Sequence, residues 1–122
     1  MSRILVVDDS PTDMMRAVEI LSSAGYVALE ARCAADGIRI ARTEHPDVIL
    51  MDMHLPDMDG IEAIGILKSD DQTSPIPIIA VTAAAGDREN AIASGCDEYI
   101  EKPVGYKNLI TVIGAFTGKT RF

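Results

Sequence analysis

Hydrophobic residues along the chain gather in five short runs of strand length, and apolar residues recur at helical spacing in the segments between them. The runs are Arg3–Val7, Val27–Ala31, Val48–Met51, Ile78–Val81 and Glu98–Ile100. The helical spacing is set by Met14, Val18 and Leu21, then by Ile38 and Ala41, then by Ile61, Ile64 and Leu67. Because a strand pattern and a helix pattern alternate throughout, the sequence predicts an α/β fold.

The strand runs also predict the layering. Segments such as ILVV and VIL are apolar at every position, which is typical of parallel strands that are covered by helices on both faces. Ser10 followed by Pro11 predicts a helix start, and Gly25 predicts the left-handed residue beyond its end, so the first helix is expected near Pro11–Ala24. The sequence therefore predicts a doubly wound parallel sheet.

Later segments complete the pattern. The polar stretch Asp70–Pro77 is too short for a linker and is interpreted as the loop into the fourth strand. A fourth helix is expected to open at Gly86 and Asp87 and to end near Gly95, and a fifth to span Tyr106–Phe116. Five βα units use up the chain, which predicts one domain over residues 1–122.

Composition narrows the function classes. The net charge of −8 disfavours nucleic acid, which binds basic surfaces, and favours a cation or a basic partner. Cys33 and Cys96 are too few for a disulfide framework and are expected to be buried free thiols. The chain shows no signal-peptide pattern and no apolar run long enough to span a bilayer. We therefore expect a soluble cytoplasmic protein.

The polar residues that follow the strand runs carry the chemistry. They are Asp8, Asp9, Asp52, Thr82, Lys102 and Pro103. In an open parallel α/β sheet, ligands bind outside the carboxyl ends of the strands, so these side chains are expected at one edge. Each also has a simpler interpretation, as a solvated turn, a loop cap or a β-branched strand residue.

Taken together, these residues are harder to explain as ordinary solvent-exposed loop residues. Carboxylates within about 4 Å of each other repel by a few kcal/mol at an effective dielectric near 20, so a cation must offset the repulsion. Hard oxygen ligands suit Mg²⁺, which often completes its shell with water and a substrate phosphate. The pattern indicates a site for phosphoryl transfer.

The chain resembles the receiver domain of bacterial response regulators over essentially its whole length. The matching pieces, in family order, are ILVVDDS, PDVILMDMHLPDMDG, IPIIAVTA and GCDEYIEKP. The resemblance implies a (βα)5 flavodoxin-like receiver fold with a five-stranded parallel sheet. The size and the segment GCDEYI also resemble single-domain regulators of the DivK type.

The resemblance implies a role for each matching residue. Asp52 would be the phosphoacceptor, and Lys102 would pair with the phosphoryl oxygens. The Mg²⁺ ligands would be Asp8, Asp9, Asp52 and the backbone carbonyl of His54. The hydroxyl of Thr82 and the backbone N–H of Ala83 would bind the phosphoryl group. Pro103 would follow a cis peptide that aims Lys102 inward.

The resemblance also implies partners. The donor would be a phosphohistidine on a sensor histidine kinase or a histidine phosphotransfer protein. Thr82 and Tyr99 would form the switch, and a downstream protein would dock on the face made by the fourth helix, fifth strand and fifth helix. No nucleic acid or membrane is expected to bind directly, and no enzymatic activity beyond self-phosphorylation and self-dephosphorylation.

Several features depart from or qualify this pattern. The segment from Thr82 to Tyr99 is shorter than usual by roughly two residues, so the fourth helix is expected to be short or displaced. His54 would lie near the phosphoryl group in this family, although a loop histidine without a role is the simpler interpretation. Ala84 cannot position an attacking water, and Met51, Met53 and Met58 are interpreted as filling gaps in the core and loop.

Two alternatives stay open. A haloacid-dehalogenase-like phosphatase also uses an aspartate nucleophile after an apolar strand, but it needs a second acid two residues later, where this chain has His54. The chain could also be a receiver module of a larger hybrid kinase or transcription regulator, with Lys119 and Arg121 at the start of a linker.

Overall fold

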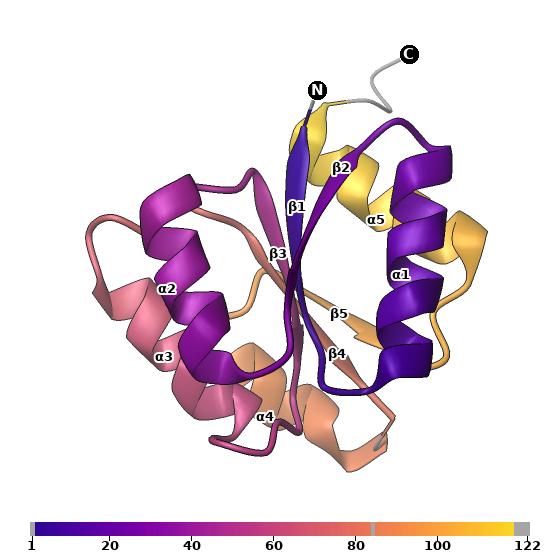
Figure 1. Cartoon of the computed structure of the whole chain (residues 1–122). Helices are drawn as coiled ribbons and strands as arrows, with labels where there is room; N and C mark the ends of the chain where they lie inside the picture. The colour runs from indigo at the N-terminus through magenta and orange to yellow at the C-terminus, as the bar shows by residue number, and fades with distance from the viewer. Residues whose placement is uncertain (1, 84, 119–122) are drawn as a thin grey trace.

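The computed structural model describes residues 2–83 and 85–118, and it contains the predicted alternation of strands and helices (Figure 1). The strands are β1 (Arg3–Val7), β2 (Val27–Ala31), β3 (Val48–Asp52), β4 (Ile78–Thr82) and β5 (Glu98–Glu101). The helices are α1 (Pro11–Ser23), α2 (Ala34–Glu44), α3 (Gly60–Ser69), η1 (Ala85–Asp87), α4 (Arg88–Ala93) and α5 (Tyr106–Thr117). The expectations for Ala84, Lys119 and Arg121 lie outside the described residues.

The strands form one parallel sheet in the order β2-β1-β3-β4-β5. Helices α2, α3 and α4 lie on one face of this sheet, and α1 and α5 lie on the other (Figure 1). This strand order with helices on both faces is the flavodoxin-like arrangement, so the predicted doubly wound fold is confirmed. The chain reverses its direction of winding between β1 and β3, and that point is where such folds bind ligands.

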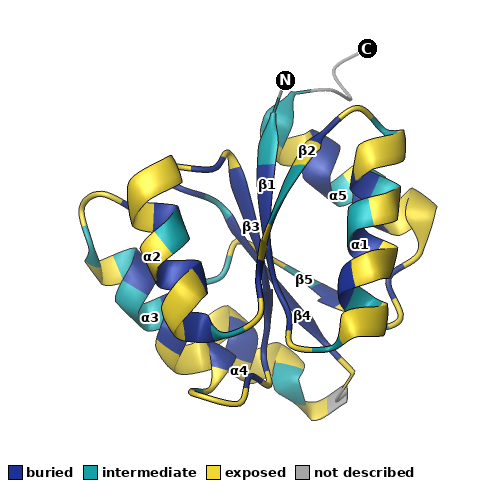
Figure 2. Ribbon diagram, in the orientation of Figure 1, coloured by how far each residue is buried: buried dark blue, intermediate teal, exposed yellow. Residues whose placement is uncertain are grey.

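Two apolar clusters hold the layers together, one on each face of the sheet. One joins Leu5, Ile49 and Ile78 to the inner sides of α2 and α3. The other joins the opposite faces of the same strands to α1 and α5. Figure 2 shows the central strands β1, β3 and β4 mostly buried, the edge strands β2 and β5 partly exposed, and the helices exposed on their outer sides. The apolar runs of β1, β3 and β4 are therefore buried on both faces, which is why they lack alternation.

Local signals fixed several helix ends. The Ser10 hydroxyl accepts a hydrogen bond from the Asp13 backbone N–H at 3.3 Å, and Gly25 has a φ of 88° just beyond α1. The fourth helix is short, as expected, but its α-helical part begins one residue late, at Arg88, after the 3₁₀ turn η1.

The buried side of α3 differs from the expected one at Ile61. Ile61 is 39% exposed, because the inward side of α3 is formed instead by residues at positions 60, 63, 64 and 67.

Two further expectations can be compared with the structure. Cys33 and Cys96 are free thiols, as predicted, but the expectation that they are buried is wrong, because each is only half-buried. Within residues 2–83 and 85–118, no helix is long and apolar enough to cross a membrane.

Candidate functional site

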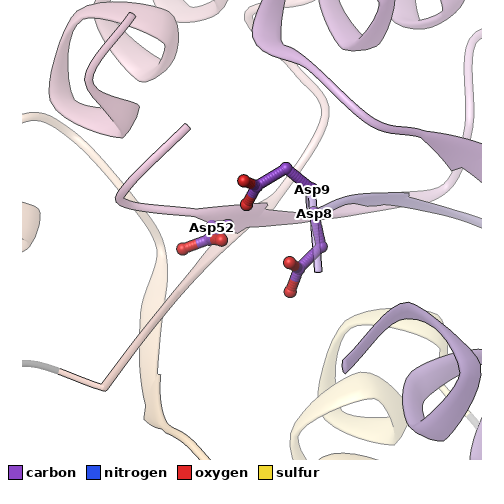
Figure 3. A group of neighbouring side chains, drawn as sticks. All are labelled: Asp8, Asp9 and Asp52. Carbon is purple, nitrogen blue, oxygen red and sulfur yellow. The ribbon is translucent and has the colours of Figure 1, made fainter. Parts of the chain in front are cut away.

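Three carboxylates lie close together at the carboxyl ends of β1 and β3, the point where the sheet changes its winding. Asp8 and Asp9 directly follow β1, and Asp52 is the last residue of β3. One carboxylate oxygen from each lies within 4.8 Å of the others (Figure 3). Asp8 and Asp52 are buried, and Asp9 is exposed. The geometry leaves two acids sheltered by the fold and one facing solvent.

Lys102 supplies a positive charge to this cluster. It follows β5, and its ammonium lies 3.0 Å from an Asp8 oxygen and 3.3 Å from an Asp52 oxygen. The Lys102 backbone N–H donates to the Thr82 carbonyl at 2.8 Å, which extends the pairing of β4 with β5 up to the lysine. The peptide bond between Lys102 and Pro103 is cis. The cation that the acidic cluster requires is therefore provided in part by the chain itself.

Asp13, which is not part of the three-carboxylate cluster, also binds Lys102. It was not among the candidates from the sequence. Its carboxylate accepts a hydrogen bond from the Lys102 ammonium at 2.9 Å. Asp13 lies in the first turn of α1, three residues after the helix-capping Ser10. Its position in the first turn beside the Asp8–Asp9 pair was the available signal, but an acid there is usually explained by the helix dipole alone.

The surroundings shift the acidity of both central groups. Burial raises the pKa of Asp52, while the hydrogen bond from the His54 amide and the charge of Lys102 oppose that rise. Burial lowers the pKa of Lys102, but hydrogen bonds to Asp13 and Asp8 and the charges of the carboxylates outweigh it and leave the pKa well above its usual value. Lys102 is therefore a fixed positive charge at neutral pH.

The cluster borders a small cavity of about 20 Å³. Asp8, Asp13, Asp52 and Lys102 line it together with apolar side chains of β1, β3 and β4. This volume can hold about one water molecule. The polar groups at its wall would provide the hydrogen bonds that such a water needs.

The loop between β3 and α3 passes close to Asp52. The His54 amide donates to an Asp52 carboxylate oxygen at 3.1 Å, and the Gly60 amide donates to the Met53 carbonyl at 2.8 Å. A Cβ atom on Gly60 would lie 2.5 Å from the Met53 Cα and 2.8 Å from the Asp52 carbonyl oxygen. A glycine is therefore required at the start of α3 for the backbone to approach the candidate phosphoacceptor.

The same loop also anchors the neighbouring helix. The two carboxylate oxygens of Asp57 accept hydrogen bonds from the Ala34 and Ala35 amides, each at 2.9 Å. These amides begin α2, whose own N-cap residue, Cys33, makes no side-chain cap. The amides lower the pKa of the Asp57 carboxyl. Asp57 therefore replaces the missing cap from a distant part of the chain.

Thr82 and His54 are joined by a residue that the sequence did not single out for chemistry. The fully buried Thr82 hydroxyl donates to an Asp87 carboxylate oxygen at 2.7 Å, and His54 Nε2 lies 2.5 Å from the same oxygen. Both hydrogen bonds lower the pKa of Asp87. His54 therefore has a side-chain partner in Asp87, and the interpretation of it as a loop histidine without a role stays a prediction.

Two other predicted residues lie at the margin of this arrangement. Ala83 is exposed and directly follows β4. Tyr99 is half-buried, and its hydroxyl oxygen is buried with no hydrogen-bond partner among residues 2–83 and 85–118. Burial, with the nearby Glu101 and Asp87 charges, raises the pKa of this phenol. A groove lined by Tyr99, Arg88 and Asn108 runs across α4, β5 and α5.

Comparison with known proteins gives the class of this fold and site. The family model for the response regulator receiver domain matches residues 4–114. The chain belongs to this family, which confirms the resemblance seen in the sequence motifs and decides against the phosphatase alternative. It is a signalling domain of two-component systems.

Individual relatives agree with this assignment. The polar-differentiation response regulator DivK of Brucella ovis is 36% identical over 117 residues, which cover 94% of this chain and 95% of DivK. The protein PilH of Pseudomonas aeruginosa is 39% identical over 117 residues, covering 94% of this chain and 97% of PilH.

A solved structure extends the comparison to the site. The receiver domain of a sensor histidine kinase from Pseudomonas aeruginosa PAO1 has a TM-score of 0.90 and 32% identity, covering 96% of this chain and 98% of that domain. A magnesium ion is coordinated in the active-site cleft of that receiver domain. In the present chain, the cluster of Asp8, Asp9 and Asp52 is the group of residues that could hold such an ion.

Proposed function

We propose that this chain accepts a phosphoryl group on Asp52 and changes its binding to a protein partner as a result. The observation that carries the proposal is the pairing of the buried Asp52 carboxylate with the Lys102 ammonium at 3.3 Å, beside Asp8 and Asp9. The ammonium favours the ionised, nucleophilic form of Asp52 and would offset charge on an incoming phosphoryl group.

The donor is a phosphohistidine on a sensor histidine kinase or a histidine phosphotransfer protein. A carboxylate oxygen of Asp52 forms the new P–O bond as the P–N bond breaks, and the electron pair of that bond stays on the imidazole nitrogen. Hydrolysis of the resulting acyl phosphate returns Asp52 and releases inorganic phosphate. The domain therefore performs self-phosphorylation and self-dephosphorylation and no other chemistry.

Mg²⁺ fits the site by its donor set. Asp8, Asp9 and Asp52 offer three oxygens within 4.8 Å of one another, and the His54 backbone carbonyl would be a fourth ligand. Hard oxygen donors of this kind suit Mg²⁺. When bound, the ion would supply positive charge for the phosphoryl oxygens.

Other residues would bind and orient the phosphoryl group. Lys102, held in place by Asp8 and Asp13, would pair with one phosphoryl oxygen. The Thr82 hydroxyl and the Ala83 backbone N–H would donate to another. Thr82 and Ala83 stand at the end of β4 and directly after it, next to β3 in the sheet, which supports this assignment.

The output is a change of shape. Movement of Thr82 toward the phosphoryl group would vacate space that the phenol of Tyr99 can enter, and this would remodel the face made by α4, β5 and α5. The buried Tyr99 hydroxyl has no hydrogen-bond partner in the described part of the chain, which supports a role in the switch, because a buried polar group without a partner gains from any rearrangement that gives it one. A downstream protein would dock on this face.

We further propose that residues 1–122 form one receiver domain that acts in the cytoplasm, where its kinase partner would present the phosphohistidine. The net charge of −8 supports a protein partner over nucleic acid.

The proposal is tested with acetyl phosphate as a small-molecule donor. Wild-type protein should become labelled in the presence of Mg²⁺ and not in EDTA, and the label should be lost in base, as expected of an acyl phosphate. Asp52→Asn should not be labelled. Asp71→Asn, a change at an exposed acid of the α3–β4 loop, should be labelled like wild type. Base-labile labelling of Asp52→Asn at the wild-type rate would disprove the assignment.

A further inference from the structure

A single carboxylate oxygen bridges the loops that follow β3 and β4. Oδ2 of Asp87 accepts the Thr82 hydroxyl at 2.7 Å and lies 2.5 Å from His54 Nε2. Thr82 is fully buried, and the Asp87 side chain is only 18% exposed. The bond from Thr82 to Asp87 is therefore partly sheltered from water, which strengthens a hydrogen bond to a charged acceptor, whereas the contact with His54 is exposed.

Asp87 occupies a position where an aspartate normally serves its own helix. It is the N-cap residue of α4, yet its side chain caps no amide of that helix and its backbone is already helical, with φ −83° and ψ −11°. N-cap residues usually have extended backbone and accept a bond from an amide in the first turn. The carboxylate of Asp87 is instead directed to Thr82 and His54.

This arrangement conflicts with the switch step. A threonine hydroxyl has one proton to donate, so Thr82 cannot donate to Asp87 and to a phosphoryl oxygen at the same time. In the structure that proton is given to Asp87. Phosphorylation of Asp52 must therefore draw the hydroxyl away from a charged partner, and the strength of that partner sets the energetic cost of switching.

We propose that Asp87 is a positioning residue that holds the Thr82 hydroxyl in the unphosphorylated orientation and opposes formation of the phosphorylated state. The inference rests on the proposed function, because it concerns the same site. Loss of the Asp87 carboxylate should then favour the bound state of a phosphoryl mimic, whereas a carboxylate that only stabilised the loop would, when removed, weaken binding or leave it unchanged.

Asp87 also carries a negative charge, and its removal would help any anion to bind nearby. The two effects are separable because only the hydrogen bond depends on the Thr82 hydroxyl. In a Thr82→Val background the charge effect of Asp87→Ala persists and the hydrogen-bond effect disappears, so a double-mutant cycle isolates the contact. Asp87→Asn removes the charge but keeps an oxygen that can accept from Thr82.

The experiment is a titration of the full chain with beryllofluoride in saturating Mg²⁺, followed by the fluorine NMR signal of the bound anion. Asp87→Ala should bind beryllofluoride about tenfold more tightly than wild type, as expected for release of one hydrogen bond to a charged group. In the Thr82→Val background the gain from Asp87→Ala should be several-fold smaller, and Asp87→Asn should lie between wild type and Asp87→Ala. Glu89→Ala, at an exposed acid in α4, is the control and should bind like wild type.

Equal gains from Asp87→Ala in both backgrounds would overturn the inference, and so would no gain or weaker binding in a folded variant. If Asp87→Ala does not fold, the comparison rests on Asp87→Asn in the two backgrounds, with the same criteria. Wild-type protein that binds no beryllofluoride with Mg²⁺ would overturn the proposed function itself. Normal wild-type binding without dependence on Asp87 would overturn only the positioning role.

Discussion

Lys102 lies among three carboxylates, and replacing it with the uncharged Lys102→Met should make the stability of the protein depend on Mg²⁺. The ammonium is 3.0 Å from Asp8, 2.9 Å from Asp13 and 3.3 Å from Asp52. At an effective dielectric of about 20, each pair attracts by about 5 kcal/mol before the cost of removing the charges from water is subtracted.

The net loss of stability on replacing Lys102 is smaller than the attraction of the three pairs added together. Losing one partner of a buried pair costs about 3–5 kcal/mol, because the other charge remains buried and unpaired. The Lys102 side chain is 14% exposed and Asp13 is 34% exposed, so part of the field is screened by solvent. We therefore expect Lys102→Met to lower the free energy of unfolding by about 2–3 kcal/mol in EDTA.

Mg²⁺ should reverse most of this loss. Lys102 competes with a cation for the oxygens of Asp8 and Asp52, so its removal should leave Mg²⁺ affinity intact or increase it. A ligand present at about a hundred times its Kd stabilises the folded state by about 2.7 kcal/mol, which is enough to offset the loss. Phosphorylation should stay slow in the variant, because the counter-charge for the phosphoryl group is gone.

The assay is urea unfolding in EDTA and in saturating Mg²⁺, with Mg²⁺ affinity measured separately by calorimetry. Lys107→Met is the matched control, since Lys107 is exposed on α5, and it should show neither effect. Our reasoning would be refuted if Lys102→Met were as stable as wild type in EDTA, or if it lost Mg²⁺ binding as fully as a variant of a metal ligand.

Three further changes give distinct outcomes. Gly60→Ala should destabilise the protein by about 1–3 kcal/mol and slow phosphorylation, because the new Cβ would lie 2.5 Å from the Met53 Cα, whereas Gly65→Ala, with nothing within 4 Å, should be neutral or stabilising in thermal unfolding. Asp57→Asn should lower the melting temperature at neutral pH. The folded-state pKa of Asp57 is below its unfolded value of 3.8, so the stability that this group contributes is present above pH 3.8 and lost as pH falls through the lower value, and the difference between the two proteins should shrink in acid. Asp9→Asn should weaken Mg²⁺ binding in calorimetry, and equal affinity would count against the proposed ligand set.

The sequence alone determined the elements and the edge where the site lies. Strands and helices could be located because the apolar pattern is local, and β1 and β2 were predicted residue for residue. Asp8, Asp9, Asp52 and Lys102 could be grouped because each follows a strand, and parallel strands end at one edge of a sheet. The resemblance of the motifs to the family predicted a role for each of them.

Contacts between distant side chains were decided only by the tertiary structure. The contact between Asp13 and Lys102 joins residues 89 positions apart. The contacts between Asp57 and the start of α2 join residues 22 and 23 positions apart. No local pattern encodes such pairs. The bond from Thr82 to Asp87 spans five positions, but it forms only because the 3₁₀ turn η1 turns the chain back toward the end of β4. Hydrophobic periodicity records only which side of an element is buried, whereas a hydrogen bond requires the position and orientation of both partners, and these are fixed when the layers pack.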